Sequence, residues 1–383
     1  MISPERHFVV RAKKKPERPR QSGPGNGSMT YRCDIQGLEA HMPTQPAAPP
    51  ASDIAMATTR AGYALPVVDV THPRFAVPDD PQAARALHEA FISGERRRAR
   101  IPKFIMRMML RSAARKSRLV HALVQSKAEY LDGLTTYVMK LGADNLVPPF
   151  DTPMDRRCAA SPHVGLLRLR MQQTARLVAD GLTDELAAAD RAPLHLINIG
   201  GGPALDSINT VILLRRMRPD LLQRPIVIHV LDSAEDGPFF GANALDALKA
   251  EGRPLHGLDV SWQHRGYDWN APATLQDLVA TLTSAGGLLA ASSEGALFEY
   301  GSDEAIVANL QALRPDGAKG ARLVAGSVTR RDEVRQRMIE QTGFKLIPRG
   351  LAGFAPLAAR AGLVIAKSEN AWLSDQVLLR PAA

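Results

Sequence analysis

The segment that most constrains the fold is residues 194–207, which read LHLINIGGGPALDS. A short apolar run ends at Asn198 and Ile199, three consecutive glycines follow, and a helical pattern begins near Leu205. Glycine adopts backbone angles that other residues avoid, and its missing side chain lets the backbone approach a ligand closely. A glycine loop between a strand and a helix is typical of the carboxyl edge of a doubly wound sheet, where such sheets bind ligands.

The periodicity of residues 193–383 agrees with this interpretation. Short apolar runs at 194–199, 226–231, 288–291 and 322–328 alternate with stretches of helical spacing. Such alternation predicts an α/β domain with a doubly wound, mainly parallel, Rossmann-like sheet. Further strands are expected at residues 344–347, 363–366 and 377–379, with no order predicted for them.

Residues 80–190 predict a separate α-helical domain, with candidate helices at 101–124, 131–141 and 166–186. The first helix is amphipathic. We expect its apolar face to be buried against the rest of this helical domain or over an acceptor pocket; the face contains Ile101, Phe104, Ile105, Met108 and Met109. Its basic face, which we expect to be solvated, contains Lys103, Arg107, Arg111 and Arg115. A helix lying on a membrane surface is the alternative.

Residues 1–60 predict a disordered basic tail, because they are rich in proline and offer little apolar surface to bury. They lack the apolar stretch of a secretory signal, and Met29, Met42 and Met56 are alternative start positions. The chain has two cysteines, Cys33 and Cys158, and no apolar run long enough to span a bilayer. A cytoplasmic location is therefore expected.

The net charge of +9 is concentrated in one segment. Residues 94–118 carry 10 Lys and Arg against one acidic residue, whereas residues 190–383 carry 20 against 21. Because the α/β part is electrically balanced, we expect no nucleic-acid partner.

Two cofactor classes suit the glycine loop. Asp232 ends the apolar run 226–231, where a carboxylate can accept both hydroxyls of a ribose. The dinucleotide fingerprint is G-x-G-x-x-G, and Gly200 and Gly202 supply its first two glycines. Leu205 stands in the place of the third. An NAD(P)-dependent oxidoreductase therefore stays open as an alternative.

Residues 193–383 resemble the class I S-adenosylmethionine-dependent methyltransferases. Asn198, Gly200 and Gly202 match the family's loop after its first strand, and Asp232 matches its acidic residue after the second. Asp268 is similar to the acidic residue that meets the adenine, and Trp269 would stack on that base. The resemblance implies S-adenosyl-L-methionine as cofactor, held by Asn198, Gly200, Gly201, Gly202, Asp232, Ser233, Asp268, Trp269 and Ser293.

The absence of three known motifs reduces the classes of methyl acceptor that we expect. The segment Ser292–Gly295, SSEG, contains neither the N/D-P-P-Y motif of DNA amino-methylating enzymes nor a nucleophilic cysteine, and it has no Asp-rich metal cluster. We therefore expect metal-independent O- or N-methylation of a small-molecule acceptor. The candidate catalytic residues are Glu294, Glu299, Tyr300 and His163. A homodimer is considered, and so is a non-catalytic protein that docks on anionic surfaces through residues 101–118.

Overall fold

The computed structural model describes residues 53–125, 131–314, 320–342 and 344–382. Seven strands form one sheet: β3 (Leu194–Ile199), β4 (Ile226–Leu231), β5 (Val260–Arg265), β6 (Leu288–Ser293), β7 (Leu323–Thr329), β8 (Leu363–Asn370) and β9 (Ser374–Pro381). Their order is β5-β4-β3-β6-β7-β9-β8. The first five are parallel, and β9 runs antiparallel to both of its neighbours. The doubly wound α/β fold predicted from the sequence is confirmed.

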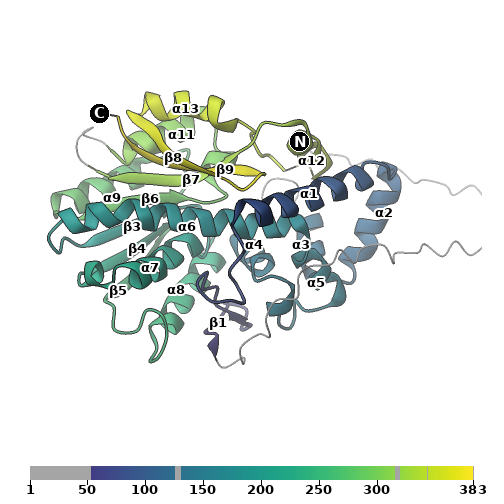
Figure 1. The fold of residues 1–383 in the computed structure, drawn as a ribbon, viewed down its shortest axis with the longest axis horizontal. Coiled ribbons are helices and arrows are strands. Elements are labelled where there is room, and N and C mark those ends of the chain that lie inside the picture. The colour runs from purple at the N-terminus through teal and green to yellow at the C-terminus, as the bar shows by residue number, and fades with distance from the viewer. Residues whose placement is uncertain (1–52, 126–130, 315–319, 343, 383) are drawn as a thin grey trace, which may run out of the picture. The chain divides into compact units, whose positions relative to one another are not determined.

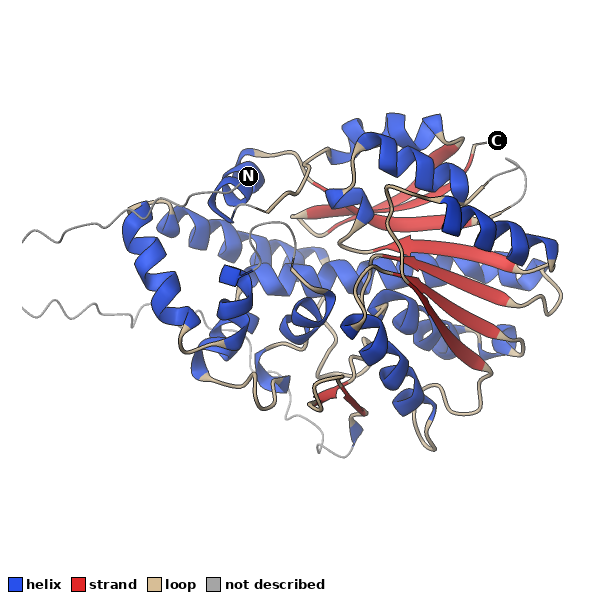
Figure 2. Ribbon diagram, turned by 180° about the vertical axis from the view of Figure 1, so that it is seen from behind, coloured by secondary structure: helices blue, strands red, loops and turns tan. Residues whose placement is uncertain are grey.

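Helices cover both faces of this sheet (Figures 1 and 2). On one face lie α6 (Pro162–Ala188), α7 (Leu205–Met217) and α8 (Asp236–Lys249), and on the other lie α9 (Ala273–Ser284), α11 (Asp303–Ala312) and α13 (Gly350–Arg360). Successive β3 residues enter different cores: Leu196 joins the cluster of the first face and Ile197 that of the second. Because both faces are covered, the strand is apolar and buried along its whole length.

Five further helices precede α6: α1 (Pro81–Arg98), α2 (Lys103–Ala114), α3 (Arg118–Gln125), α4 (Gly133–Lys140) and α5 (Pro153–Ala159). Figure 1 shows them gathered beyond one end of the sheet, with α6 running from among them along its face. Two short helices, α10 (Leu297–Tyr300) and α12 (Glu333–Thr342), follow β6 and β7, and 3-10 turns lie at Ala143–Asn145 and Pro219–Leu222. The described residues belong to one compact unit.

The prediction of disorder up to residue 60 is wrong for residues 53–60. There β1 (Met56–Thr58) pairs antiparallel with β2 (Ala64–Pro66). Ile54 and Ala57 are buried in the main core, so this segment does have apolar surface to bury. Residues 1–52 lie outside the described part of the chain.

The amphipathic helix expected at 101–124 is two helices, α2 and α3, and the prediction that its apolar face is buried is wrong. Phe104 is 72% exposed and Met108 is 64% exposed. The principal neighbour of α2 is α3, which packs mainly against the rest of the helical segment through Leu119 and Val120. The apolar spacing therefore predicted a helix correctly, but the described residues leave the side chains of Phe104 and Met108 uncovered.

The expected strands at 363–366 and 377–379 are present as the longer hairpin β8–β9. The strand expected at residues 344–347 is absent from the structure, where this segment is a loop. The backbone N–H of Ile347 donates to the carbonyl of Glu299 at 2.8 Å, which fixes the loop beside α10.

Candidate functional site

The glycine loop joins β3 to α7 at the carboxyl edge of the sheet. Gly200 and Gly202 have φ angles of +68° and +56°, in the region that disfavours side chains. A Cβ on Gly200 would lie 2.8 Å from the Cβ of Ala296 and 3.0 Å from the ring of Trp269. A Cβ on Gly202 would lie 2.9 Å from the Cα of Gly133. Both positions thus require glycine for backbone angle and for space.

Gly201 packs closely against the side chain of Asn198, which lies beneath the loop. A Cβ on Gly201 would lie 2.1 Å from Asn198 Oδ1. The Asn198 Nδ2 group donates to Asp206 Oδ1 at 2.8 Å and to Ser292 Oγ at 3.2 Å. Asn198 is fully buried and ties β3 to α7 and β6. It was predicted to bind the cofactor, but the structure places it under the loop rather than on the cavity wall.

Asp232 follows β4 and faces the same loop. Its Oδ2 accepts the backbone N–H of Gly202 at 2.8 Å, and its Oδ1 accepts the backbone N–H of Ala234 at 2.8 Å. Asp232 is half-buried, and it lines the cavity together with Ser233. Each oxygen can accept further hydrogen bonds, because a carboxylate offers about four lone-pair sites.

The turn after β5 holds the next two predicted residues. Asp268 Oδ1 accepts both the backbone and the side-chain N–H of Asn270 at 2.9 Å, which closes the turn. The Trp269 carbonyl accepts the Asn309 amide at 2.7 Å, and the Trp269 ring lies against Gly200. Asp268 and Trp269 both line the cavity. Ser293 is instead engaged with backbone, donating to the Ile199 carbonyl at 3.0 Å.

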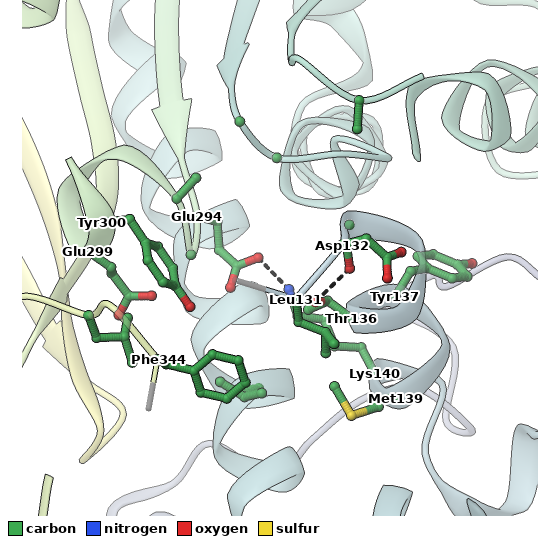
Figure 3. Close-up of a pocket in the computed structure, with 18 of the residues that line it drawn as sticks. Leu131, Asp132, Thr136, Tyr137, Met139, Lys140, Glu294, Glu299, Tyr300 and Phe344 are labelled. Carbon is green, nitrogen blue, oxygen red and sulfur yellow. Dashed lines mark hydrogen bonds and ion pairs between the residues drawn. The ribbon is translucent and has the colours of Figure 1, made fainter. Parts of the chain in front are cut away.

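A cavity of about 570 Å³ adjoins these residues. This volume lies within the range typical of small-molecule sites. Figure 3 shows its wall around α4 and the β6–α10 segment, where Lys140, Glu294, Glu299 and Tyr300 approach one another. The helices that close it are α4, α6 and α12. The expectation that the basic helix covers the pocket is therefore wrong, and of residues 101–124 the described lining includes Leu123 alone.

A buried ion network forms another part of the cavity wall. Lys140 Nζ lies 2.5 Å from Glu294 Oε2, and Arg170 Nε lies 2.5 Å from Glu294 Oε1. Arg170 Nη1 contacts Glu299 Oε2 at 2.9 Å, and the Thr329 hydroxyl donates to Glu299 Oε1 at 2.8 Å. The four charged side chains are at most 6% exposed.

This network determines the charge of Glu294. Burial alone would raise the pKa of Glu294, but the charges of Arg170 and Lys140 and their hydrogen bonds lower it to about 2. Glu294 is one of the four candidate catalytic residues predicted from the sequence. With both of its oxygens bound to cations and so low a pKa, it holds Lys140 and Arg170 in place and is a poor base.

Glu299, a further candidate, is held by Arg170 and Thr329, and the other two candidates, Tyr300 and His163, have neutral side chains near pH 7. Burial, and then the charge of Glu299, raise the pKa of Tyr300 to about 12. Burial, and then the charges of Arg335 and Arg170, lower the pKa of His163 to about 3. His163 Nδ1 is buried with no hydrogen-bond partner among the described residues. Both side chains line the cavity.

Three cations at this site were not predicted: Lys140, Arg170 and Arg335. A signal for Arg170 did exist in the sequence, because it stands three residues after Leu167 and four after Leu166, on the same face of α6 as these apolar residues. A charge at such a position is almost never fully buried unless it is paired. Its partners, however, lie 124 and 129 residues away.

The described residues contain neither a metal-binding cluster nor a helix that could span a membrane. No group of three or more His, Cys, Asp or Glu side chains in this part of the chain could hold a metal ion. No helix among the described residues is long and apolar enough to cross a membrane.

Comparison with known proteins finds similarity of structure only: no protein-family model and no curated protein matches the chain. Magnesium protoporphyrin IX methyltransferase from Synechocystis PCC 6803, with bound SAH, matches 57% of this chain and 87% of its own, at 16% identity and TM-score 0.37. An O-methyltransferase family protein from Burkholderia thailandensis matches 60% and 61%, at 14% identity and TM-score 0.37.

An O-methyltransferase from neocarzinostatin biosynthesis, solved with S-adenosylmethionine and 2-hydroxy-5-methyl naphthoic acid, matches 58% of both chains at 18% identity and TM-score 0.34. The chain thus spans about six tenths of the length of the latter two proteins. These similarities concern the fold. All three of these similar proteins are described as methyltransferases, and their identity with this chain is 14–18%.

Proposed function

We propose that the protein transfers a methyl group from S-adenosyl-L-methionine to a small-molecule acceptor. One observation carries this proposal: the glycine loop, Asp232 and Trp269 border the same cavity as the buried ion network around Glu294. A cofactor and an acceptor can therefore lie in one enclosed space, as a direct transfer between them requires.

The residues present fit the cofactor. Gly200 and Gly201 present bare backbone to the cavity, and Trp269 offers a flat apolar ring beside them. We propose that the Asp232 carboxylate accepts the ribose hydroxyls and that Asp268 accepts the amino group of the adenine, since both line the cavity. When bound, the cofactor supplies a methyl group on a positively charged sulfur.

The chain's own residues would position the reactants and exclude water. The in-line displacement of a methyl group depends chiefly on how the two reactants are oriented. In well-oriented systems, orientation lowers the activation barrier by about 7–11 kcal/mol. The Lys140–Glu294–Arg170–Glu299 network gives the acceptor wall a fixed set of charges, because each member is held by a buried partner. Helices α4 and α6 shield this wall from bulk solvent.

An acceptor hydroxyl or ammonium must lose a proton during transfer. His163 lines the cavity, but burial and the charges of Arg335 and Arg170 lower its pKa to about 3, so its ring is neutral at pH 7. Its low pKa makes it a weak base, so we propose acceptors that ionise readily, such as phenols or acids. We further propose that oxygen or nitrogen is methylated without a protein-bound metal.

The test is a calorimetric titration with S-adenosylhomocysteine and, separately, with NAD⁺ and NADP⁺. We expect saturable binding of S-adenosylhomocysteine in the micromolar range and no binding of the dinucleotides. Trp269→Ala should weaken that affinity at least fivefold, while Trp262→Phe, which leaves the cavity wall intact, should not. Tighter binding of a dinucleotide would refute the proposal and favour the oxidoreductase alternative.

A further inference from the structure

One cation in the cavity wall has no anion to pair with. Arg335, on α12, is 3% exposed and lines the cavity. Its Nη1 contacts Met338 Sδ at 3.5 Å, and its Nε is buried without a hydrogen-bond partner. Among the described residues, no carboxylate oxygen lies within 4.0 Å of its guanidinium nitrogens.

The contrast with the other two buried cations is direct. Lys140 and Arg170 each lie 2.5 Å from an oxygen of Glu294. Glu299, which is the acidic group with the largest favourable effect on Arg335, is already bound by Arg170 and Thr329. This end of the cavity therefore holds three cations and two carboxylates, and Arg335 is the cation in excess.

Burying an unpaired charge costs free energy, because the charge loses its hydration without gaining a partner. An anionic ligand that pairs with this charge offsets that cost, and the pairing strengthens its binding. A guanidinium presents its donors in a planar fork that matches the two oxygens of a carboxylate or phosphate. His163 lines the same cavity with a buried, unpartnered ring nitrogen and can add a hydrogen bond. Burial also lowers the pKa of Arg335, as expected for a cation without a close anion.

We propose that Arg335 binds an oxyanion of the methyl acceptor, so that the acceptor is an acid carrying a carboxylate or a phosphate. This inference rests on the proposed methyl transfer and names the class of its substrate. Arg335 then acts as a specificity-determining residue.

The test uses the full chain, S-adenosylmethionine labelled in its methyl group, and a small-molecule extract of the source organism separated by anion exchange. We expect label in the anion-retained fraction. Arg335→Gln should lower that incorporation at least tenfold, Arg335→Lys less, and Arg337→Gln, an exposed control on the same helix, not at all. S-adenosylhomocysteine affinity should be unchanged in all three variants. Phosphatase treatment of the fraction distinguishes a phosphate from a carboxylate.

Label confined to unretained, neutral compounds would overturn the oxyanion inference while leaving methyl transfer intact. Equal incorporation by wild type and Arg335→Gln would also overturn it. Loss of S-adenosylhomocysteine binding by the wild type would instead count against the proposed function. Thermal denaturation guards against misfolding: because Arg335 has no ion pair, Arg335→Gln should unfold at the wild-type temperature or above.

A second observation, independent of the cavity, concerns α2. Ten large apolar side chains are exposed among the described residues, and four of them lie on this one helix: Phe104, Met108, Met109 and Leu110. Exposed apolar residues scattered singly are ordinary, but a cluster marks an interaction surface. Arg107 and Arg111 are exposed on the same helix, and Arg96–Arg98, Arg115 and Lys116 flank it.

We propose that α2 docks on an anionic lipid surface, with Phe104 and Met108 entering the headgroup region and the flanking arginines contacting lipid phosphates. Charge complementarity selects this partner, because residues 94–118 carry 10 basic side chains and one acidic one. Each basic residue near an anionic membrane adds to the attraction between helix and lipid. An apolar face flanked by basic residues is typical of helices that lie in the interface.

Co-sedimentation with vesicles tests this. We expect binding to vesicles of 30% phosphatidylserine in phosphatidylcholine, little binding to phosphatidylcholine alone, and release at 0.5 M NaCl. The double variant Phe104→Ser/Met108→Ser should lose at least tenfold in affinity, whereas Met217→Ser, another exposed apolar residue, should not. Equal binding to neutral vesicles, or a wild-type dimer that the double variant converts to monomer without any vesicle binding, would overturn the proposal.

Discussion

The carboxylate of Asp232 accepts the backbone N–H of Gly202 at 2.8 Å, so the residue expected to bind a ribose also holds the glycine loop. The bond links the end of β4 to the loop after β3. It leaves Asp232 on the cavity wall, with lone pairs available to a ligand. Positioning and binding therefore meet in one side chain.

Asp232→Ala should weaken S-adenosylhomocysteine binding by tenfold to a hundredfold. Hydrogen bonds to a charged group contribute about 1.5–3 kcal/mol each, and the variant also frees the loop. Asp232→Asn keeps an oxygen that can accept the Gly202 N–H and should lose less. Titration calorimetry measures both, with the exposed Asp220→Ala as control. Unchanged affinity in Asp232→Ala would remove this residue from the cofactor site.

Gly201→Ala should destabilise the protein even without a ligand, because its Cβ would lie 2.1 Å from Asn198 Oδ1. Overpacking of this kind costs about 1–3 kcal/mol. Gly266→Ala is the matched control, since nothing lies within 4 Å of its Cβ position and its φ is not positive. Thermal denaturation of the ligand-free proteins separates the two. If Gly201→Ala unfolds at the wild-type temperature, the close contact with Asn198 is not maintained in solution.

Glu294→Gln should be strongly destabilising at pH 7, by about 3–5 kcal/mol, because it leaves Lys140 without its anion and Arg170 with one instead of two. The folded pKa of Glu294, about 2, lies below its ordinary value of 4.5. Its ionisation thus stabilises the fold fully above pH 4.5, and this contribution is lost as the pH falls towards 2.

The difference in unfolding free energy between wild type and Glu294→Gln should therefore shrink below pH 4.5. Urea denaturation at a series of pH values measures it, and Glu304→Gln, an exposed glutamate on α11, serves as control. A difference that stays constant from pH 7 to pH 3 would show that Glu294 is not held ionised by its two cations.

A chain that begins at Asp53 should be as stable as the full chain, whereas one that begins at Thr59 should not. The shorter chain loses β1 and the buried side chain of Ile54, worth about 1.5–3 kcal/mol. It also loses the bond from the Val67 N–H to the Ala55 carbonyl at 2.7 Å. The melting temperatures of the full chain and of the two shortened chains test this prediction. Equal values for all three would show that β1 contributes nothing to stability.

The parts of this protein that could be predicted from sequence are those determined locally. The strand, the glycines and the helix of residues 194–207 are contiguous, so their pattern alone indicated the loop and the sheet edge it occupies. Asp232, Asp268 and Trp269 reach the same cavity because each follows a parallel strand.

The features that could not be predicted depend on contacts between residues that are far apart in the sequence. The Arg170–Glu294 bond joins residues 124 positions apart, and spacing within α6 does not identify the partner. The place of β9 between β7 and β8 is likewise set by packing rather than by its own pattern. For α2, periodicity revealed an apolar face but not whether another element covers it, and Phe104 is exposed.

Helix α6 is a single unbroken helix of 27 residues, about 40 Å long, that packs against both the preceding helices and the sheet. Near its start Arg170 holds the acceptor wall, and further on Gly181 sits against Leu323 and Leu378 of the sheet. A bend between these points would break the packing at one of them. Any adjustment of the cavity to a ligand is therefore expected in the shorter helices that line it, α4 and α12, and not in α6.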